Sequence, residues 1–448
     1  MHARRLGLLC FLAIPACSSG PTPAAAPTAA PGAPGAAPGP TAVAGRAADP
    51  ATAPTSAPAA PPSTAAPVSP TDEAAATRAA NTFTTKLYAR MRRAPGNIML
   101  SGTSVRQPLA LTAAGARGET ARELATALSV DPDPTKAAAA ARAEVAAWQE
   151  ARGKSELVVA NRLWTDKSFA VKDDFKNVAT SAYGAGVEPV DFAHSPDVAR
   201  KAINQWVAER TESKIPDLLA EGAVDKRTRL VVSNAVYFKG RWSSPFSKDA
   251  TKNEAFKVTA AKSVDVPTMH ANGQHAYAHV GNVKVLSMRY EGSQLGMLIV
   301  LPDDTAGLAK VEEALTPETF EAWSKAASAQ RVTVSLPRFG FKWGGPMESA
   351  LQELGIKSAF GQKADFAGIA EPAGGERLQM SRVVQKTWVA VDEEGTEAAA
   401  ASGITMSVTS AQTGPVAEFK ADHPFLFFVY DTKRARILFA GRVSDPKS

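Results

Sequence analysis

Both cysteines of this 448-residue chain, Cys10 and Cys17, lie at the extreme N-terminus. No disulfide can therefore connect two parts of the chain beyond residue 17. A fold built from the remaining residues must be stabilised by packing, and apolar residues make up 45% of the sequence, which is enough for a large core. We expect a hydrophobic core without covalent cross-links.

The first 16 residues have the pattern of an export signal. Two arginines precede an apolar stretch from Leu6 to Ile14, which is too short to span a bilayer stably. The next residues, ending at Cys17, are similar to the lipobox of bacterial lipoproteins, in which the cysteine is lipidated and becomes the new N-terminus. Pro15 departs from the small residue usual there, so an ordinary signal peptide with an incidental cysteine is the alternative. We expect an exported protein, either a cell-envelope lipoprotein or an extracellular or periplasmic one.

Residues 17–70 consist almost entirely of Ala, Pro, Thr, Ser and Gly. Such a segment has too little apolar surface to offset its ordering entropy, and repeated proline favours an extended spacer. We predict a disordered linker between Cys17 and a domain that covers residues 71–448. A lipid on Cys17 would be the only contact with a membrane.

Residues 71–448 combine helical and strand patterns. Phe83, Leu87 and Met91 recur every four residues, which predicts a helix with one apolar face. Thr120 and Glu123 have the spacing of a capping box, and Thr316-Pro317 resembles the start of a helix.

Other segments have strand character. Leu295–Leu301 is apolar on both faces, as in a central strand, while 425–430 and 437–439 predict a buried C-terminal hairpin. The fold class is therefore α+β with large antiparallel sheets.

The sequence contains no signal for an enzyme. Gly-x-Ser-x-Gly does not occur, Gly153-Lys-Ser lacks the upstream glycine of a phosphate loop, and no cysteine is available as a nucleophile after residue 17. The net charge of +6 is not concentrated in a basic run, which argues against nucleic-acid binding. No cofactor is implied. His270, His275 and His279 are the best metal candidate, and solvent-facing histidines are the alternative.

A long loop near the C-terminus is the strongest functional signal. Trp388–Asp392 alternates like a strand, and a small-residue segment follows as far as Gly414, well beyond usual loop lengths. Glu393 and Glu394 begin this loop. Adjacent strand residues point to opposite faces, so the pair cannot form one acid–base site, and we expect an exposed, charged strand end.

The segment from Glu393 to Ala400 resembles the hinge of the serpin family of protease inhibitors. Other parts of the chain resemble serpins in the same order, from about Thr71 to the C-terminus. These segments are Asn97–Ser101, Ala114–Thr120, Ala160–Trp164, Ser233–Trp242 with Pro245-Phe246, Leu298–Pro302, Leu336–Phe339, Ala364–Ile369, Asp422–Phe428 and Leu438–Arg442.

The resemblance implies the serpin fold, with three β-sheets named A, B and C, about nine helices and an exposed reactive loop. It also implies a mechanism. A protease cuts the loop and forms an acyl-enzyme, and the cleaved loop inserts as a new strand into sheet A before deacylation. The expected partners are secreted serine proteases, with cysteine proteases as the alternative class, and the inhibitor is expected to be a monomer.

The serpin loop length places the reactive bond at Thr409-Ser410. Val408-Thr409 is the neighbouring alternative, and Met406-Ser407 is a third. No Arg or Lys lies between Glu397 and Lys420, which argues against trypsin-like targets and favours elastase-like or subtilisin-like ones. A non-inhibitory serpin that acts as a binding or carrier module is the alternative function.

The hinge residues fit insertion. These residues are Glu393, Glu394, Gly395, Thr396, Glu397, Ala398, Ala399, Ala400 and Ala401. Gly395 frees the backbone at the pivot. If Thr396 faces inward, the next inward residues are small and uncharged, whereas a carrier serpin typically has bulky or charged ones there.

Four further residues match serpin positions that control opening of the sheet. They are Ser104, Asn234, Trp242 and Gln385, which we interpret as gating residues of the regions that serpins call the shutter and the breach. Serpins commonly have a histidine at the position of Gln385. A glutamine can still hydrogen-bond, so we expect the lock to persist with altered strength.

Overall fold

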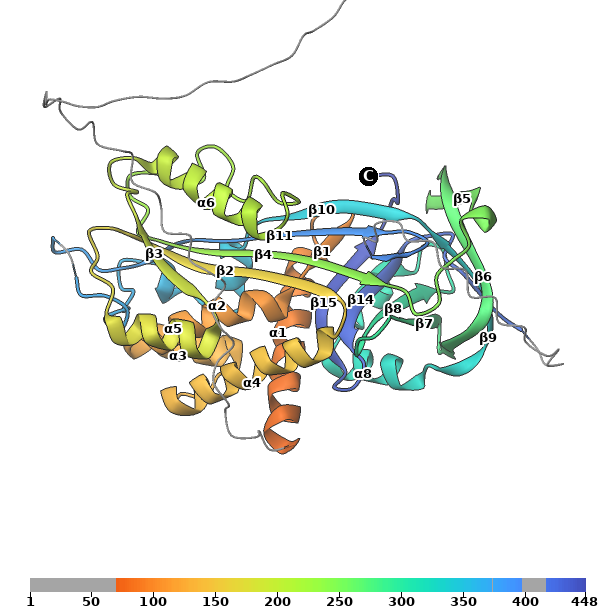
Figure 1. The fold of residues 1–448 in the computed structure, drawn as a ribbon, viewed down its shortest axis with the longest axis horizontal. Helices are drawn as coiled ribbons and strands as arrows, with labels where there is room; N and C mark the ends of the chain where they lie inside the picture. The colour runs from red at the N-terminus through yellow and green to blue at the C-terminus, as the bar shows by residue number, and fades with distance from the viewer. Residues whose placement is uncertain (1–69, 373, 397–415) are drawn as a thin grey trace, which may run out of the picture. The chain divides into compact units, whose positions relative to one another are not determined.

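A computed structural model of the protein describes residues 70–372, 374–396 and 416–448 (Figure 1). These residues form nine α-helices, two short 3-10 helices and fifteen strands, which confirms the expected α+β class and the helix number. The α-helices are α1 (Pro70–Met91), α2 (Gly102–Gly115), α3 (Gly118–Leu128), α4 (Pro134–Arg152), α5 (Asp173–Tyr183), α6 (Pro196–Arg210), α7 (Leu308–Glu313), α8 (Pro317–Ala326) and α9 (Glu348–Glu353). The 3-10 helices are η1 (Lys248–Ala250) and η2 (Ser358–Phe360).

The strands form two hydrogen-bonded sheets. The first has six strands in the order β10 (Phe339–Pro346), β11 (Met380–Val391), β12 (Gly395–Thr396), β4 (Leu230–Arg241), β2 (Glu156–Asp166) and β3 (Gly186–Val190). The second has nine strands: β1 (Ile98–Leu100), β15 (Arg436–Val443), β14 (Phe425–Asp431), β8 (Leu295–Pro302), β7 (Val283–Arg289), β6 (Lys262–Val280), β9 (Ser328–Pro337) and β13 (Ala417–Lys420), with β5 (Lys252–Thr259) paired to β6.

The number of sheets differs from the expected three over the described residues. Strand β6 has 19 residues, and it pairs with β5 and β9 along most of its length and with β7 at its C-terminal end. Because one continuous strand takes part in both sets of pairings, the two smaller sheets of the expected fold are joined here by hydrogen bonds.

The six-stranded sheet contains a parallel pair between antiparallel neighbours. Strands β4 and β11 are parallel, with Leu230 opposite Met380 at one end and Tyr237 opposite Trp388 at the other. Strand β11 is antiparallel to β10, and β4 is antiparallel to β2. We call the parallel β4–β11 edge the seam.

Helices cover both faces of the six-stranded sheet. Figure 1 shows α6 on one face and α1 to α5 with the nine-stranded sheet on the other. Strand β8 is buried at every position, and β14 with β15 forms a buried hairpin, so the predictions for both segments are confirmed. Packing of this extent is what a domain without disulfides requires.

Two predicted helix starts had different outcomes. Thr316 forms a capping box with Thr319, and Pro317 begins α8 as predicted. The capping box at Thr120 and Glu123 is wrong. Thr120 lies inside α3, and its hydroxyl accepts a hydrogen bond from the amide of Asp365, while the Glu123 carboxylate accepts bonds from the amides at the start of η2. The side chains of Thr120 and Glu123 therefore bind backbone amides that are distant in sequence, and they do not cap the start of α3.

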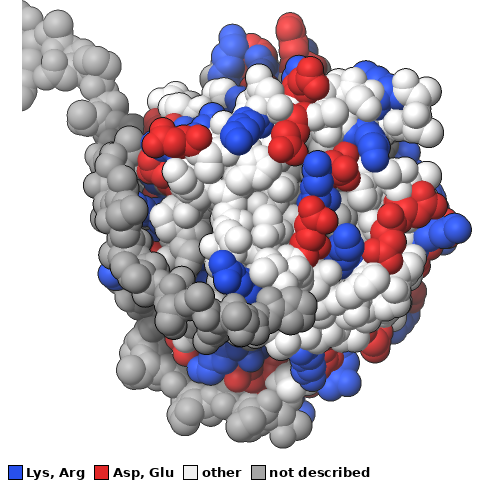
Figure 2. Space-filling view, turned by 90° about the vertical axis from the view of Figure 1, so that its right-hand side faces the viewer, with Lys and Arg blue, Asp and Glu red and all other residues white. Residues whose placement is uncertain are grey.

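Charge is mixed on the surface shown in Figure 2. Lys, Arg, Asp and Glu side chains are interspersed there, beside a broad area that carries no charged side chain. A nucleic-acid site would instead gather basic residues. None of the helices in the described part of the chain is both long enough and apolar enough to cross a membrane.

Candidate functional site

A tight turn joins β11 to β12. The Asp392 side chain accepts hydrogen bonds from the amides of Glu394 (2.9 Å) and Gly395 (3.1 Å). The Asp392 amide donates to the Gly395 carbonyl at 2.9 Å. This Asx turn reverses the chain, so that β12 runs back between β11 and β4.

Strand β12 occupies the end of the seam. Thr396 lies opposite Val391 of β11 and Gly240 of β4, and β12 is antiparallel to both strands. A Cβ atom on Gly395 would lie 2.0 Å from the Gly240 carbonyl oxygen, so only glycine fits there. Thr396 is 1% exposed, and its hydroxyl hydrogen-bonds the Tyr290 hydroxyl at 2.7 Å. Thr396 therefore faces the protein interior.

Glu393 is not the exposed strand end that the sequence predicted. Its side chain is 2% exposed and forms an ion pair with Arg338 at 2.5 Å, with a further hydrogen bond from Thr251. Glu394 forms a separate ion pair with Lys248, also at 2.5 Å. The two carboxylates do use different partners, as expected, but tertiary contacts bury the first of them.

The Glu393 ion pair has an electrostatic consequence. Burial alone would raise the pKa of Glu393, but hydrogen bonds from Arg338 and Thr251 outweigh it and lower that pKa below its usual value of 4.5. Burial raises the pKa of Asp392, which is the opposite direction. The ionised Glu393 side chain therefore stabilises this turn, while ionisation of Asp392 opposes it.

This difference predicts a pH dependence. The Glu393 carboxylate stabilises the native form above pH 4.5, and the stabilisation is lost as the pH falls through its lowered pKa. Asp392 has a raised pKa, so its contribution is present below pH 3.8 and lost as the pH rises. Urea unfolding measured between pH 7 and pH 3 should show a smaller acid-induced loss of stability in Glu393→Gln than in wild type. Glu353→Gln, which removes an exposed carboxylate elsewhere, is the control; equal slopes in both variants would contradict the assignment.

Trp242 closes the same end of the seam. Its ring nitrogen donates to the Asp392 carbonyl at 3.0 Å, and its backbone amide donates to the Glu394 carbonyl at 2.8 Å. The ring stacks on Tyr290 with centroids 4.7 Å apart. Burial raises the pKa of Tyr290, so its hydroxyl remains protonated beside Thr396. Trp242 thus holds the turn from both its backbone and its side chain.

A second cluster lies in the middle of the seam, at the position where Gln385 is opposite Asn234. The Gln385 amide donates to the Asn234 side-chain oxygen at 2.5 Å, and the Ser104 hydroxyl donates to the same oxygen at 3.0 Å. Gln385 also donates to the Ser101 carbonyl (2.9 Å) and accepts from the Ser101 amide (3.1 Å). Gln385 thus connects β11 to β4 and to the start of α2.

The structure adds residues that the sequence did not reveal. The Asn234 amide donates to the Asn161 side chain of β2 at 2.5 Å, and Asn161 donates to the Ser104 carbonyl at 3.3 Å. Asn161 and Asn234 are directly opposite each other in the antiparallel β2–β4 pair. Tyr290 and Arg338 were also missed, because their partners at the hinge are more than 50 residues away in sequence.

Several predicted site residues lie outside the described residues. They are Cys17, the later hinge residues Glu397, Ala398, Ala399, Ala400 and Ala401, and the reactive-bond candidates Met406, Ser407, Val408, Thr409 and Ser410. The described part of the hinge ends at Thr396, inside the six-stranded sheet.

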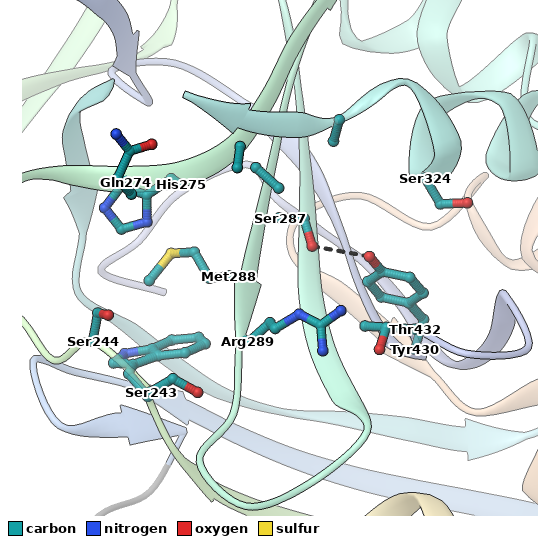
Figure 3. A pocket seen from close by; sticks show the side chains of 14 residues that line it. Ser243, Ser244, Gln274, His275, Ser287, Met288, Arg289, Ser324, Tyr430 and Thr432 are labelled. Atoms are coloured by element: carbon teal, nitrogen blue, oxygen red, sulfur yellow. Dashed lines mark hydrogen bonds between the residues drawn. The ribbon is translucent and has the colours of Figure 1, made fainter. Parts of the chain in front are cut away.

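The three candidate histidines do not form a metal site. His270 contacts Glu254 and Ser335, each at 3.1 Å, whereas His279 pairs with Asp303 at 2.7 Å. His275 instead lines a cavity of about 360 Å³ near Met288 (Figure 3). No group of three metal-binding side chains occurs among the residues described. Strand β6 carries all three histidines, but its length separates them.

Comparisons with known proteins agree with this architecture. A family model described as "Serpin (serine protease inhibitor)" matches residues 78–446. The leukocyte elastase inhibitor of Bos taurus is 38% identical over 380 residues, covering 82% of this chain and 99% of that protein. An uncharacterized serpin-like protein of Thermococcus kodakarensis is 35% identical over 377 residues, covering 84% and 87%. The crystal structure of Serpin48 of Tenebrio molitor superposes with a TM-score of 0.73 at 33% identity, covering 83% and 98%.

Proposed function

We propose that this chain, which belongs to the serpin family of protease inhibitors and is not an enzyme, inhibits by trapping its target. A target protease cuts the reactive loop, and the loop then inserts into the six-stranded sheet while the acyl-enzyme persists. This proposal goes beyond the family assignment, which by itself does not show trapping. The geometry of the seam supports it.

The parallel pairing at the seam is the observation that carries the proposal. Parallel pairs are slightly less stable per residue than antiparallel ones, and β4–β11 lies between antiparallel neighbours. Strand β12 already pairs antiparallel with both strands at one end. A loop that continued in the direction of β12 would replace one parallel pair with two antiparallel pairs along the whole seam.

The register of β12 determines where each loop residue would go. Thr396 lies opposite Val391 and Gly240. Six residues further on, Ser402 would lie opposite residue 391 − 6 = 385 on β11 and residue 240 − 6 = 234 on β4. Insertion would therefore break the Gln385–Asn234 hydrogen bond and place the Ser402 hydroxyl between the two amides. A hydroxyl both donates and accepts, so it can satisfy both side chains.

The side chains of the loop suit both faces of the sheet. Residues two apart along a strand share a face, so Ala398, Ala400, Ser402, Ile404 and Met406 would join Thr396 on the interior side. None of these is charged. Ala401 and Gly403 would point to the other face, beside Ala235 and Val384, which pack in the apolar cluster beneath α6. Small residues fit that covered position.

Insertion would be strongly favourable. A strand of this length adds about ten hydrogen bonds, each contributing roughly 0.5–1.5 kcal/mol net. Burial of Ile404 and Met406 adds roughly 1.5–3 kcal/mol for each side chain. The sum is comparable to or larger than the total stability of an ordinary domain, about 5–15 kcal/mol. The uncut protein would therefore be metastable, which is what a trap requires.

The proposed targets are elastase-like or subtilisin-like serine proteases. Thr409 is a small β-branched residue, which suits a shallow apolar specificity pocket, and the segment between Glu397 and Lys420 contains no basic residue. Relatives at 37–39% identity bear the name leukocyte elastase inhibitor, which agrees with this class. Cysteine proteases are the second class to test.

Denaturing gels and intact-mass analysis test the proposal directly. We expect residues 71–448, mixed with elastase-like and subtilisin-like proteases, to yield a covalent adduct and a released peptide that begins at Ser410. A peptide beginning at Thr409 or Ser407 would place the reactive bond at Val408-Thr409 or Met406-Ser407 and would still agree with trapping. Loop cleavage without an adduct across serine and cysteine proteases would contradict trapping and indicate a non-inhibitory serpin that acts as a binding or carrier module.

We further propose that the protein is exported and tethered. The lipobox-like sequence ending at Cys17 and the spacer of residues 17–70 support this, since a lipid on Cys17 would hold the inhibitor domain away from a cell-envelope membrane. Intact-mass analysis of the mature N-terminus tests it. A diacylglycerol-modified Cys17 is expected, and an unmodified N-terminus would indicate a released protein.

A further inference from the structure

A cavity of about 360 Å³ lies near the end of β7 (Figure 3). Its size falls within the range of about 300–1,000 Å³ that is typical of pockets for small organic molecules. Five parts of the chain line it: residues 242–244 after β4, 274–276 of β6, 287–289 of β7, the junction of α8 and β9, and the end of β14. We call this cavity the β7 pocket; apart from Trp242, its residues have no role in the proposed trap.

Arg289 supplies the one charge that the lining of the β7 pocket carries at neutral pH. The lining contains no Asp, Glu or Lys. Burial lowers the pKa of His275, so its imidazole is neutral there. The Arg289 guanidinium is exposed, and it makes no ion pair or hydrogen bond within the part of the chain that the structure describes. The pocket therefore offers one cation that no carboxylate neutralises.

The Arg289 side chain is directed along the pocket wall. Figure 3 shows it extending from the end of β7 toward Tyr430 and Thr432. Burial raises the pKa of Tyr430, while its hydrogen bond with Ser287 and the positive charge of Arg289 act in the opposite direction, so the guanidinium is close to this hydroxyl. The Ser287 and Tyr430 hydroxyls bond each other at 2.9 Å. The guanidinium donors thus remain available to a ligand.

The rest of the lining combines apolar surface with uncharged polar groups. Trp242 and Met288 contribute large apolar side chains that are 2% and 3% exposed. Ala276 and Ala329 are directly opposite each other in the β6–β9 pair, and their small side chains leave the space of the pocket open. Serine and threonine residues complete the wall. Such a lining suits a flat, apolar body with a few hydrogen-bonding groups.

We propose that the β7 pocket binds a small organic monocarboxylate with a flat apolar body, and that its carboxylate pairs with Arg289. A guanidinium offers two parallel N–H donors that match the two carboxylate oxygens, and such charge-assisted bonds are roughly twice as strong as neutral ones. A dianion such as phosphate would keep one charge unneutralised, because the pocket has a single cation.

The orientation of the ligand follows from the opposite wall. Ser324 and Ala327 place the C-terminal end of α8 there, and the partial negative charge of a helix C-terminus disfavours an anion. The carboxylate would therefore lie at Arg289 and the apolar body beside Trp242 and Met288. This inference goes beyond the proposed function and does not depend on it.

Calorimetric titration of the uncut protein with cinnamate tests the proposal. Cinnamate is a flat aromatic monocarboxylate, and cinnamamide is the matched neutral probe because it has the same shape without the charge. We expect cinnamate to bind at one site and cinnamamide to bind at least about tenfold more weakly. Arg289→Met keeps the aliphatic stem of an exposed residue and removes its charge. It should lower the affinity for cinnamate to that for cinnamamide and leave the affinity for cinnamamide unchanged.

Two further variants locate the site. Ala329→Phe fills the pocket from an exposed strand position and should abolish binding of both probes. Arg331→Met removes an exposed arginine on the same strand that hydrogen-bonds Asn272 outside the pocket, and it should bind both probes as wild type does. Circular dichroism checks that each variant is folded.

Three results would overturn the proposal: no binding of cinnamate to the wild type, equal affinities for the two probes, or unchanged cinnamate affinity in Arg289→Met. Unchanged binding in Ala329→Phe would also overturn it, because the probe would then lie elsewhere. Trapping is measured separately in the protease assay, so either idea can fail alone.

Discussion

Thr396→Arg is expected to turn the inhibitor into a substrate: the loop should be cut as before, and the yield of covalent complex should fall by at least about tenfold, because burial of an unpaired charge costs several kcal/mol. Thr396 is 1% exposed and lies against the buried Tyr290 hydroxyl. Position 396 is already interior in the uncut form, so an arginine there would displace β12 from the seam and would have to be buried again before any later loop residue could insert. Titration of a target protease, with complex and cleaved inhibitor quantified on the same gel, measures the effect.

The neighbouring position provides a matched control. Glu397→Arg introduces the same side chain one residue later, where the strand alternation directs it to solvent in the inserted state. Its complex yield should remain near that of wild type. Ala398→Glu returns to the interior side and should behave like Thr396→Arg. Full trapping by both interior variants would refute insertion along the β12 register.

Asn234→Ala is expected to destabilise the uncut protein by about 2–4 kcal/mol, because it leaves several buried polar groups without partners. Asn234 is fully buried and accepts bonds from Gln385 and Ser104 while donating to Asn161. These bonds join β11, β4, β2 and α2. Urea unfolding of the uncut form measures the loss, and native gels should reveal earlier conversion to loop-inserted or associated forms.

Gln385→His is the matched change on the facing strand. An imidazole retains one ring donor that can reach the Asn234 oxygen, so this variant should lose much less stability than Asn234→Ala. The comparison also measures what the glutamine contributes at a position where serpins commonly have histidine. Equal losses in the two variants would show that the network depends on the exact shape of the Gln385 amide, and a negligible loss in Asn234→Ala would show that the network does not lock the seam.

Much of the fold could be predicted from local patterns. Leu295–Leu301 is apolar at nearly every position and forms the fully buried strand β8, and the C-terminal apolar runs form the β14–β15 hairpin. Thr316-Pro317 begins α8. Burial and helix starts can be read this way because they depend on residues only a few positions apart.

The hinge was recognised from the sequence through its resemblance to serpins, but its environment was not. Glu393 and Glu394 looked like an exposed strand end, yet Arg338, 55 residues away, pairs with Glu393 in the interior. The apparent capping box at Thr120 and Glu123 failed for the same reason, since residues 357–365 bind both side chains. A polar residue does not encode the distant partner that allows it to be buried.

The sequence by itself indicated an α+β domain without disulfides, and after β11 a long loop in which every second residue from Thr396 onward is uncharged. Only the tertiary structure decided that β12 enters the seam and that Gln385, Asn234, Asn161 and Ser104 share one network. The physical reason is the separation along the sequence over which each kind of interaction acts. Periodicity and capping depend on residues within one or two helical turns or a few strand positions. Sheet order and buried polar pairing join residues up to 359 positions apart, and these depend on the packing of the whole domain.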